Sequence, residues 1–168
     1  MTKGLQLIFT LLLCGCAGGP PLKTVSAVDL NRYSGKWHEI ARYPNWFQRS
    51  CTGQVTAEYL PRKDGSITVL NACARKGGSM EQVKGRATVV PQSGNAKLKV
   101  SFGGPIAGAY WIIGLDPAYQ WALVGHPSRR YLWILARSPG ISEKLYAQIV
   151  QSAVEQGYEA SRIVKTPQ

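Results

Sequence analysis

Short runs of alternating apolar and polar residues, each ended by turn residues, constrain the fold of this chain more than any other feature. Residues 96–102 place Lys97, Lys99 and Ser101 between apolar neighbours, and residues 53–60 alternate in the same way. Period-two alternation gives a strand one buried face and one wet face. Runs of strand-forming residues are separated by turns at 36–44, 53–60, 66–73, 82–91, 96–102, 109–115, 119–125 and 130–137. Because the connections are short, this pattern predicts an all-β fold, an eight-stranded up-and-down antiparallel β-barrel.

The last predicted strand is apolar on both faces, so it needs a covering layer outside the barrel. The segment that follows it supplies one, because Ser142 is a good helix N-cap and Gly157 a good C-terminal stop. Between them, apolar residues recur at helical spacing: Leu145, Tyr146, Ile149, Val150, Ala153 and Val154. We therefore expect a C-terminal α-helix packed on the outer face of the eighth strand.

The N-terminal residues have the composition of an export signal. Lys3 precedes a mostly apolar stretch from Leu5 to Leu13, which is too short to span a bilayer. It ends in Leu13-Cys14-Gly15-Cys16, which resembles the lipobox of bacterial lipoproteins and implies lipidation of Cys16. Modification of Cys14 and a plain secretory signal are the alternatives. We expect a signal peptide over 1–15, a lipidated tether with nothing to bury over 16–27, and the barrel domain over 28–168.

Two cysteines remain after the expected cleavage and lipidation, Cys51 and Cys73. An exported protein folds in an oxidising compartment, where an even pair of cysteines is usually bonded. The pair straddles the turn at residues 61–65, so a hairpin would place the two nearly opposite each other. We therefore expect a disulfide, and a nucleophilic or metal-binding cysteine is the alternative.

The chain is strongly basic, with a formal net charge of +11. Such a charge favours anionic surfaces, including phospholipid and lipopolysaccharide head groups. The alternative is that the charge is spread over outward strand faces for solubility. No recognised nucleic-acid-binding module is present, so no nucleic-acid partner is expected.

Sequence motifs for catalysis are absent. The chain has no Gly-x-Ser-x-Gly elbow, no His-Glu-x-x-His, no phosphate-binding glycine loop and no Cys-x-x-Cys. Its two histidines, His38 and His126, fall on a predicted outward strand position and in a turn. No acidic pair stands out as a general acid and base. The sequence argues against an enzyme, and no cofactor or metal is predicted.

Three short motifs carry a family resemblance: Gly35-Lys36-Trp37, Asp116-Pro-Ala-Tyr119, and Arg137 at the end of the eighth strand. In this order they resemble the three conserved regions of the lipocalins, in particular the lipid-anchored bacterial lipocalins and animal relatives of the apolipoprotein D type. The resemblance implies structural roles for Gly35, Trp37, Asp116, Tyr119 and Arg137. It implies that the Arg137 guanidinium lies over the Trp37 indole and closes one barrel end.

An eight-stranded barrel leaves an interior about wide enough for one small ligand. The inward positions that we expect to line it are Tyr59, Asn71, Phe102, Tyr110 and Trp133. The segment 44–50 joins the first two strands at the opposite end from Trp37, so Trp46, Phe47 and Arg49 should overhang the open mouth. The alternatives are that the interior residues fill a dry core and that this loop packs onto its own barrel.

The resemblance implies a carrier of fatty acids or lysophospholipids, anchored in the bacterial outer membrane and facing the periplasm. It would store or move lipids in envelope maintenance or stress, and a homodimer is left open. Two other classes of function stay open as well. One is a lipocalin-type enzyme with a free Cys51 or Cys73, and the other is an interaction protein that docks on anionic lipid without using the barrel interior.

Overall fold

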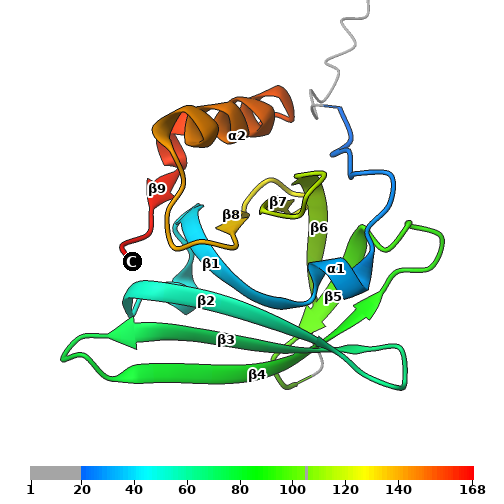
Figure 1. Cartoon of the computed structure of the whole chain (residues 1–168), viewed down its shortest axis with the longest axis horizontal. Coiled ribbons are helices and arrows are strands. Elements are labelled where there is room, and N and C mark those ends of the chain that lie inside the picture. Colours follow the sequence, from blue (N-terminus) through cyan, green and yellow to red (C-terminus); the bar gives the residue numbers. More distant parts are fainter. Residues whose placement is uncertain (1–19, 105) are drawn as a thin grey trace, which may run out of the picture.

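The fold is a single closed β-barrel with one helix outside it (Figure 1). The computed structural model describes residues 20–104 and 106–168, so the predicted lipidation site Cys16 lies outside the described residues. The strands are β1 (Gly35–Arg42), β2 (Cys51–Pro61), β3 (Ile67–Arg75), β4 (Met80–Val89), β5 (Lys97–Ser101), β6 (Gly108–Leu115), β7 (Trp121–Gly125) and β8 (Leu132–Ala136). Each pairs antiparallel with the next, and β1 pairs with both β8 and β2, which confirms the predicted up-and-down barrel.

One end of the barrel is closed by Arg137 and Trp37. The Arg137 guanidinium carbon lies 3.9 Å from the centre of the fully buried Trp37 indole. Its N–H groups donate to the backbone carbonyls of Lys36, Arg32, Ser34 and Tyr119 at 2.7–3.3 Å. The Trp37 Nε1 donates to the carbonyl of Tyr33 in α1 (Leu30–Tyr33), the helical turn that lies across this end. We call this the closed end.

The Asp116 motif shapes a turn that supports the closed end. The Asp116 carboxylate accepts hydrogen bonds from the backbone N–H groups of Ala118 and Gln120, at 3.1 and 3.0 Å. The turn holds Tyr119 at a φ of 61°, and its hydroxyl accepts from the N–H of Asp29 at 2.9 Å. The two residues therefore place the Tyr119 carbonyl where Arg137 can donate to it.

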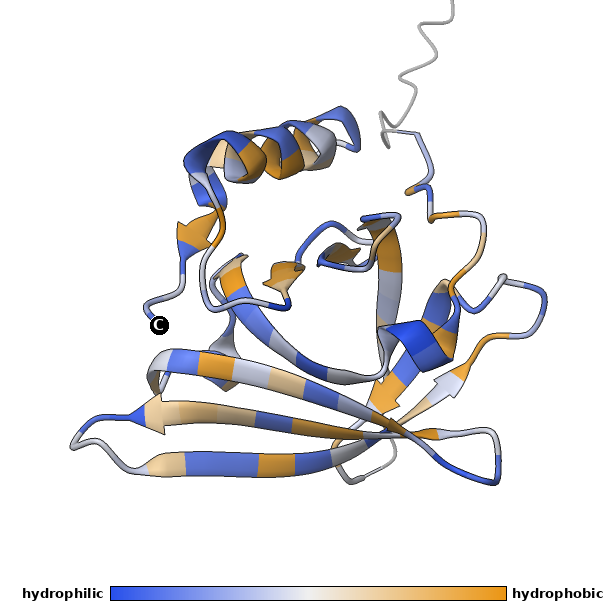
Figure 2. Cartoon of the chain, in the orientation of Figure 1, coloured by the Kyte–Doolittle hydropathy of each residue, from blue (hydrophilic) through white to orange (hydrophobic). Residues whose placement is uncertain are grey.

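The predicted outer helix is α2 (Glu143–Glu155), which begins after an N-cap at Ser142. Its buried residues Ile149 and Ala153 belong to a cluster with Leu132 and Ile134 on the outer face of β8. Figure 2 shows polar residues along the side of α2 that faces away from the barrel. β8 is therefore apolar on both faces because its inner face packs in the barrel core and its outer face packs against α2.

The C-terminal segment completes the barrel wall, which the sequence analysis did not predict. After η2 (Ala160–Arg162), the short strand β9 (Val164–Lys165) pairs with Ala41 and Arg42 of β1, beyond the residues of β1 that pair with β2. The Gln54 N–H donates to the Pro167 carbonyl at 2.8 Å. A Cβ at Gly53 would lie 2.8 Å from that same oxygen, so β2 needs a glycine there.

Residues 20–28, which we call the N-terminal strap, run along the outside of the barrel and end with Val28 in the buried cluster at the closed end. Leu22 is buried in the cluster under α2, and the Val25 N–H donates to the Ile112 carbonyl at 3.0 Å. Val28 is 2% exposed and bonded to Gly94 in the loop between β4 and β5. The expectation that this part of the tether has nothing to bury is therefore wrong.

Cys51 at the start of β2 and Cys73 near the end of β3 form a disulfide. Their Cα atoms lie 5.6 Å apart across the β2–β3 hairpin, on either side of the turn that was expected to bring them together. Neither sulfur is a thiol in this structure. The enzyme alternative therefore loses the nucleophile that it required.

Replacing Arg137 with Lys should lower the free energy of unfolding by about 2–4 kcal/mol, since an ammonium cannot reach the same set of carbonyls and leaves some unpaired. Arg130→Lys, at an exposed turn position, is the matched control and should change stability by less than about 0.5 kcal/mol. Urea unfolding of both variants measures the difference. Equal stabilities would contradict the role assigned to Arg137.

Candidate ligand-binding site

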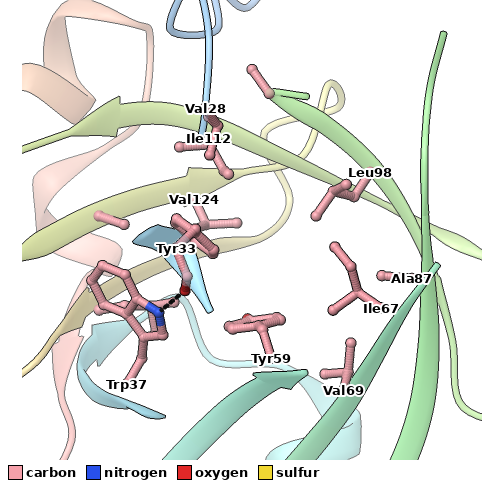
Figure 3. Close-up of a cluster of buried hydrophobic side chains, with 13 residues drawn as sticks. Val28, Tyr33, Trp37, Tyr59, Ile67, Val69, Ala87, Leu98, Ile112 and Val124 are labelled. Atoms are coloured by element: carbon pink, nitrogen blue, oxygen red, sulfur yellow. Dashed lines mark hydrogen bonds between the residues drawn. The ribbon is translucent and has the colours of Figure 1, made fainter. Parts of the chain in front are cut away.

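The half of the barrel next to the closed end is filled with side chains. Figure 3 shows this cluster, in which Tyr33, Trp37, Tyr59, Ile67 and Leu98 come from α1 and four strands. Every one of these five is at most 4% exposed. Tyr59, which was expected to line a ligand site, therefore belongs to the packed floor beneath the site.

Three tyrosine hydroxyls meet at the top of this floor. The Tyr59 hydroxyl donates to that of Tyr110 at 2.8 Å, and the hydroxyls of Tyr33 and Tyr110 lie 2.7 Å apart. Burial raises the pKa of all three above the ordinary value of 10.0. Tyr110, also predicted to line the interior, is half-buried. The cluster thus places neutral hydroxyls where the filled half gives way to the open half.

The other half of the interior is accessible to solvent. Strand register places Val83 of β4 opposite Asn71 of β3, on the same face as the core residues Val69 and Ala87. Both side chains are therefore directed into the barrel, yet Val83 is 44% exposed and Asn71 is only partly buried. An inward apolar side chain that water can reach indicates room for a ligand in this half.

Two polar atoms near this region have no hydrogen-bond partner among the residues that the structure describes. They are the Asn71 Oδ1 and the Arg75 Nε, both from β3 and both buried. Arg75 faces the interior together with Glu81, with which it forms an ion pair. Buried polar groups are nearly always paired in folded proteins, so an unpaired amide oxygen beside an accessible interior is a candidate contact for a ligand.

Aromatic rings line one side of the mouth of the open half. Phe47, in η1 (Trp46–Gln48), lies 5.8 Å from Tyr131 and 6.3 Å from Trp133, measured between ring centres. Tyr131 and Trp133 are stacked at 6.0 Å, and Trp46 contacts Phe47 edge-on. The structure therefore brings together three residues predicted for the site, Trp46, Phe47 and Trp133. Tyr131 was missed, although it shares the inward parity of Trp133.

Phe102 and Arg49 are the remaining predicted contacts. Phe102 is 46% exposed just beyond β5, and its ring covers Gly85, where a Cβ would lie 2.7 Å from the ring. It therefore lies over the inward face of β4. Arg49 follows η1 and is exposed. Of the two, only Phe102 contacts the barrel interior.

A buried carboxylate, Glu39, anchors the mouth, and the sequence analysis did not find it. Glu39 is 3% exposed, and its Oε1 accepts from Arg42 and from the Thr166 hydroxyl, both at 2.6 Å. Its Oε2 accepts from Gln48 Nε2 at 2.7 Å. The Gln48 Oε1 in turn accepts from Trp133 Nε1 at 3.0 Å. One carboxylate thus links β1, the η1 loop and the C-terminal segment, and through Gln48 it reaches β8.

A bulge in β1 explains why this network was not predictable from alternation. The register with β8 shifts between Glu39 and Ala41, so Arg42 pairs with the inward residue Trp133. Without the bulge, Arg42 would have the parity of His38 and face outward. The sequence signal for this network is the spacing in Glu39-Ile-Ala-Arg42. In a regular strand, residues three apart point to opposite faces, so the two side chains can form an ion pair only if the strand bulges.

A second hollow lies outside the barrel. It has a volume of about 420 Å³ and is bounded by outward side chains of β1 to β4, including His38, Glu58, Leu70 and Met80.

The second histidine, His126, lies in a tight turn, where its Nδ1 accepts from the Ser128 backbone N–H at 3.1 Å. Within residues 20–104 and 106–168, no three His, Cys, Asp or Glu side chains gather as a metal site. None of the helices described there is long and apolar enough to cross a membrane.

A barrel that is closed by a Trp–Arg stack at one end and accessible at the other is the cup-shaped kind of β-barrel protein that can hold a small ligand. A family model described as a lipocalin-like domain matches residues 28–168. The chain therefore belongs to the lipocalin family, as its three motifs indicated.

Relatives of known name agree with this assignment. The outer membrane lipoprotein Blc of Vibrio cholerae is 38% identical over 165 residues, which cover 96% of each chain. Temperature-induced lipocalin-1 of Arabidopsis thaliana is 42% identical over 156 residues, covering 88% of this chain and 83% of that protein. Among solved structures, insecticyanin from the tobacco hornworm Manduca sexta has a TM-score of 0.72 at 20% identity, with 89% and 85% coverage. The last likeness is one of fold.

Glu39→Gln should lower the free energy of unfolding by about 3–5 kcal/mol, because it removes the buried carboxylate and leaves the partly buried Arg42 guanidinium without its ionic partner. The matched control is Glu143→Gln, whose exposed carboxylate pairs with Lys165 at 2.7 Å and should contribute less than about 1 kcal/mol. Denaturant unfolding of both variants tests this. A loss in Glu39→Gln no larger than in the control would contradict a structural role for the network.

Stability should decline at alkaline pH because of the tyrosine cluster. The folded-state pKa values of Tyr33, Tyr59 and Tyr110 lie above the 10.0 of an unfolded chain, so their stabilisation is complete below pH 10 and is lost as the pH rises above it. Each such tyrosine adds up to about 1.4 kcal/mol per pH unit to the slope. Urea unfolding across this range measures it. Tyr59→Phe should make the decline less steep, and an unchanged slope would show that Tyr59 ionises freely.

Proposed function

We propose that this protein is a lipid-anchored carrier that binds a fatty acid or a lysophospholipid in the open half of its barrel. The observation that carries the proposal is the solvent-accessible interior, in which Val83 and Asn71 point inward beneath an aromatic mouth. An acyl chain matches this surface because binding removes apolar area of both the chain and the barrel from water. Each Å² of apolar area buried contributes ~25 cal/mol to the binding free energy before the costs of association.

The polar end of such a ligand has two kinds of contact available. Inside, Asn71 Oδ1 and the hydroxyl cluster of Tyr33, Tyr59 and Tyr110 can bond a hydroxyl or a protonated carboxyl group. At the mouth, the exposed Arg49 suits an anionic head group. A chain that enters tail first would leave its head group at the mouth, which is the orientation that we favour.

The anchor is the second part of the proposal. It rests on the lipobox-like Leu13-Cys14-Gly15-Cys16, and the outer membrane lipoprotein Blc of Vibrio cholerae aligns over 96% of both chains. We infer that Cys16 carries the lipid, that the barrel faces the periplasm, and that the protein stores or moves lipids in envelope maintenance or stress. Mass spectrometry of the mature protein from a bacterial host tests the anchor, since acylation at Cys16 adds a defined mass that Cys16→Ser would abolish.

The carrier proposal is tested by titrating a soluble form that begins at Ala17, so that the strap is retained, with a fatty acid and a lysophospholipid. Calorimetry should show saturable binding at one site, with Kd on the order of a micromolar or tighter. The ratio of the two affinities reports how much the head group contributes. Absence of binding by either ligand would overturn the proposal.

Trp133→Ala should weaken binding by roughly ten- to a hundredfold, since it removes a large apolar surface from the site. The matched control is Trp111→Ala, because Trp111 lies on the outer face of β6 beneath Lys97. Circular dichroism should show that both variants keep the fold. If the two variants bind equally well, Trp133 is not part of the site.

A further inference from the structure

Apolar side chains that face solvent gather on loops at the open end. Trp46 is 72% and Phe47 47% exposed in the loop between β1 and β2, while Phe102 is 46% and Ile106 82% exposed in the loop between β5 and β6. Around the barrel, β3 and β4 lie between these two loops on one side, and β7 and β8 lie between them on the other. They therefore stand on opposite sides of the mouth. Large apolar groups exposed together in this way mark an interaction surface.

The loops of the open end carry charge of one sign, and the acidic strand residue Glu81 beside them is paired with Arg75. The described loop residues there are 43–50, 76–79, 102–104, 106–107 and 126–131, which we call the rim, and they contain no Asp or Glu. They contain Arg49, Lys76, Arg129 and Arg130. Glu159, whose backbone N–H bonds the Tyr43 hydroxyl beside the rim, is paired with Arg162 at 3.7 Å. The rim therefore combines apolar tips with unopposed cations, a combination that suits a bilayer with anionic head groups.

The N-terminal strap brings the start of the domain to the same end. Its first residue, Pro20, accepts a hydrogen bond through its carbonyl from Arg129 in the rim, and Arg129 is held in turn by the Gln156 carbonyl at 2.6 Å. From Pro20 the strap runs toward the closed end, where Val28 bonds Gly94. Cys16 precedes Pro20 by four residues, a reach of at most about 14 Å. A lipid on Cys16 would therefore hold the rim, and not the closed end, beside the membrane.

We propose that the rim docks on the surface of the phospholipid bilayer that holds the anchor, with the barrel mouth facing the lipid. Trp46 and Ile106 enter the interfacial region, the rim cations contact anionic head groups, and an acyl ligand passes between bilayer and barrel without crossing water. The orientation rests on the proposed function, because it takes Cys16 as the anchored residue. The apolar and basic character of the rim is independent of that assumption.

A second copy of the chain fits this surface less well than a bilayer does. Rim-to-rim association would bring Arg49, Lys76 and Arg130 of one copy against the same cations of the other, with no acidic rim residue to pair them. Like charges facing each other across an interface oppose binding. An anionic bilayer offsets these charges and accepts apolar tips of any shape.

The test uses the full chain, matured in a bacterial host and reconstituted into vesicles of phosphatidylethanolamine and phosphatidylglycerol. Lipids brominated along the acyl chain should quench Trp46 emission, and Trp46→Phe should remove most of that quenching. The double variant Trp46→Ser/Ile106→Ser should slow transfer of a fluorescent fatty acid from protein to vesicles by roughly tenfold. The control is Leu60→Ser, which changes an exposed apolar residue near the end of β2 at the closed end, away from the rim.

The outcomes separate this proposal from the carrier function. Unquenched Trp46, or transfer by the rim variant at the wild-type rate, would overturn docking even if the ligand binds with full affinity. If no fatty acid binds, the carrier proposal fails, and quenching of Trp46 still decides whether the rim docks. Loss of quenching when phosphatidylcholine replaces phosphatidylglycerol would support the part assigned to the rim cations.

Discussion

The contact on which the rest of the structure depends is that between Arg137 and Trp37. A barrel wall closes only if its first and last strands meet, and here the guanidinium at the end of β8 covers the indole of β1 at 3.9 Å. The same group bonds carbonyls of α1, β1 and the Asp116 turn, which would otherwise point unpaired into a crowded barrel end. Because one charged side chain satisfies so many backbone groups, this end is fixed and needs no ligand.

The fixed end makes the two halves of the interior different. Large side chains fill the closed half, so the room left in the barrel is concentrated at the other end, where Val83 and Asn71 meet solvent. The tyrosine hydroxyls mark the boundary, since each is satisfied by another and none requires water or a charge. The candidate site is therefore the part of the barrel interior that the packing of the closed end leaves unfilled, and Tyr59 and Tyr110 lie at its floor.

Sequence reasoning succeeded where the physical signal is local. Alternation within single strands predicted the barrel, the spacing of Ile149 and Ala153 predicted the outer helix, and the position of Cys51 and Cys73 about one turn predicted their disulfide. It failed where the outcome depends on register between strands. The bulge that turns Arg42 inward, the two-residue β9 and the burial of Leu22 depend on partners far along the chain, which no periodicity encodes.

The Glu39 network shows why the mouth needed such non-local contacts. Only residues 35–38 of β1 pair with β2, so near the mouth the barrel wall is completed by the C-terminal segment. Two residues of β9 could not hold that segment by backbone bonds alone. Thr166 and Gln48 both bond the Glu39 carboxylate, so the C-terminus and the aromatic loop are held by the same buried group. A buried ion pair adds little net stability. Its hydrogen bonds can form, however, in only a few arrangements of the surrounding segments. This restriction fixes Phe47 and Trp133 in their positions over the interior.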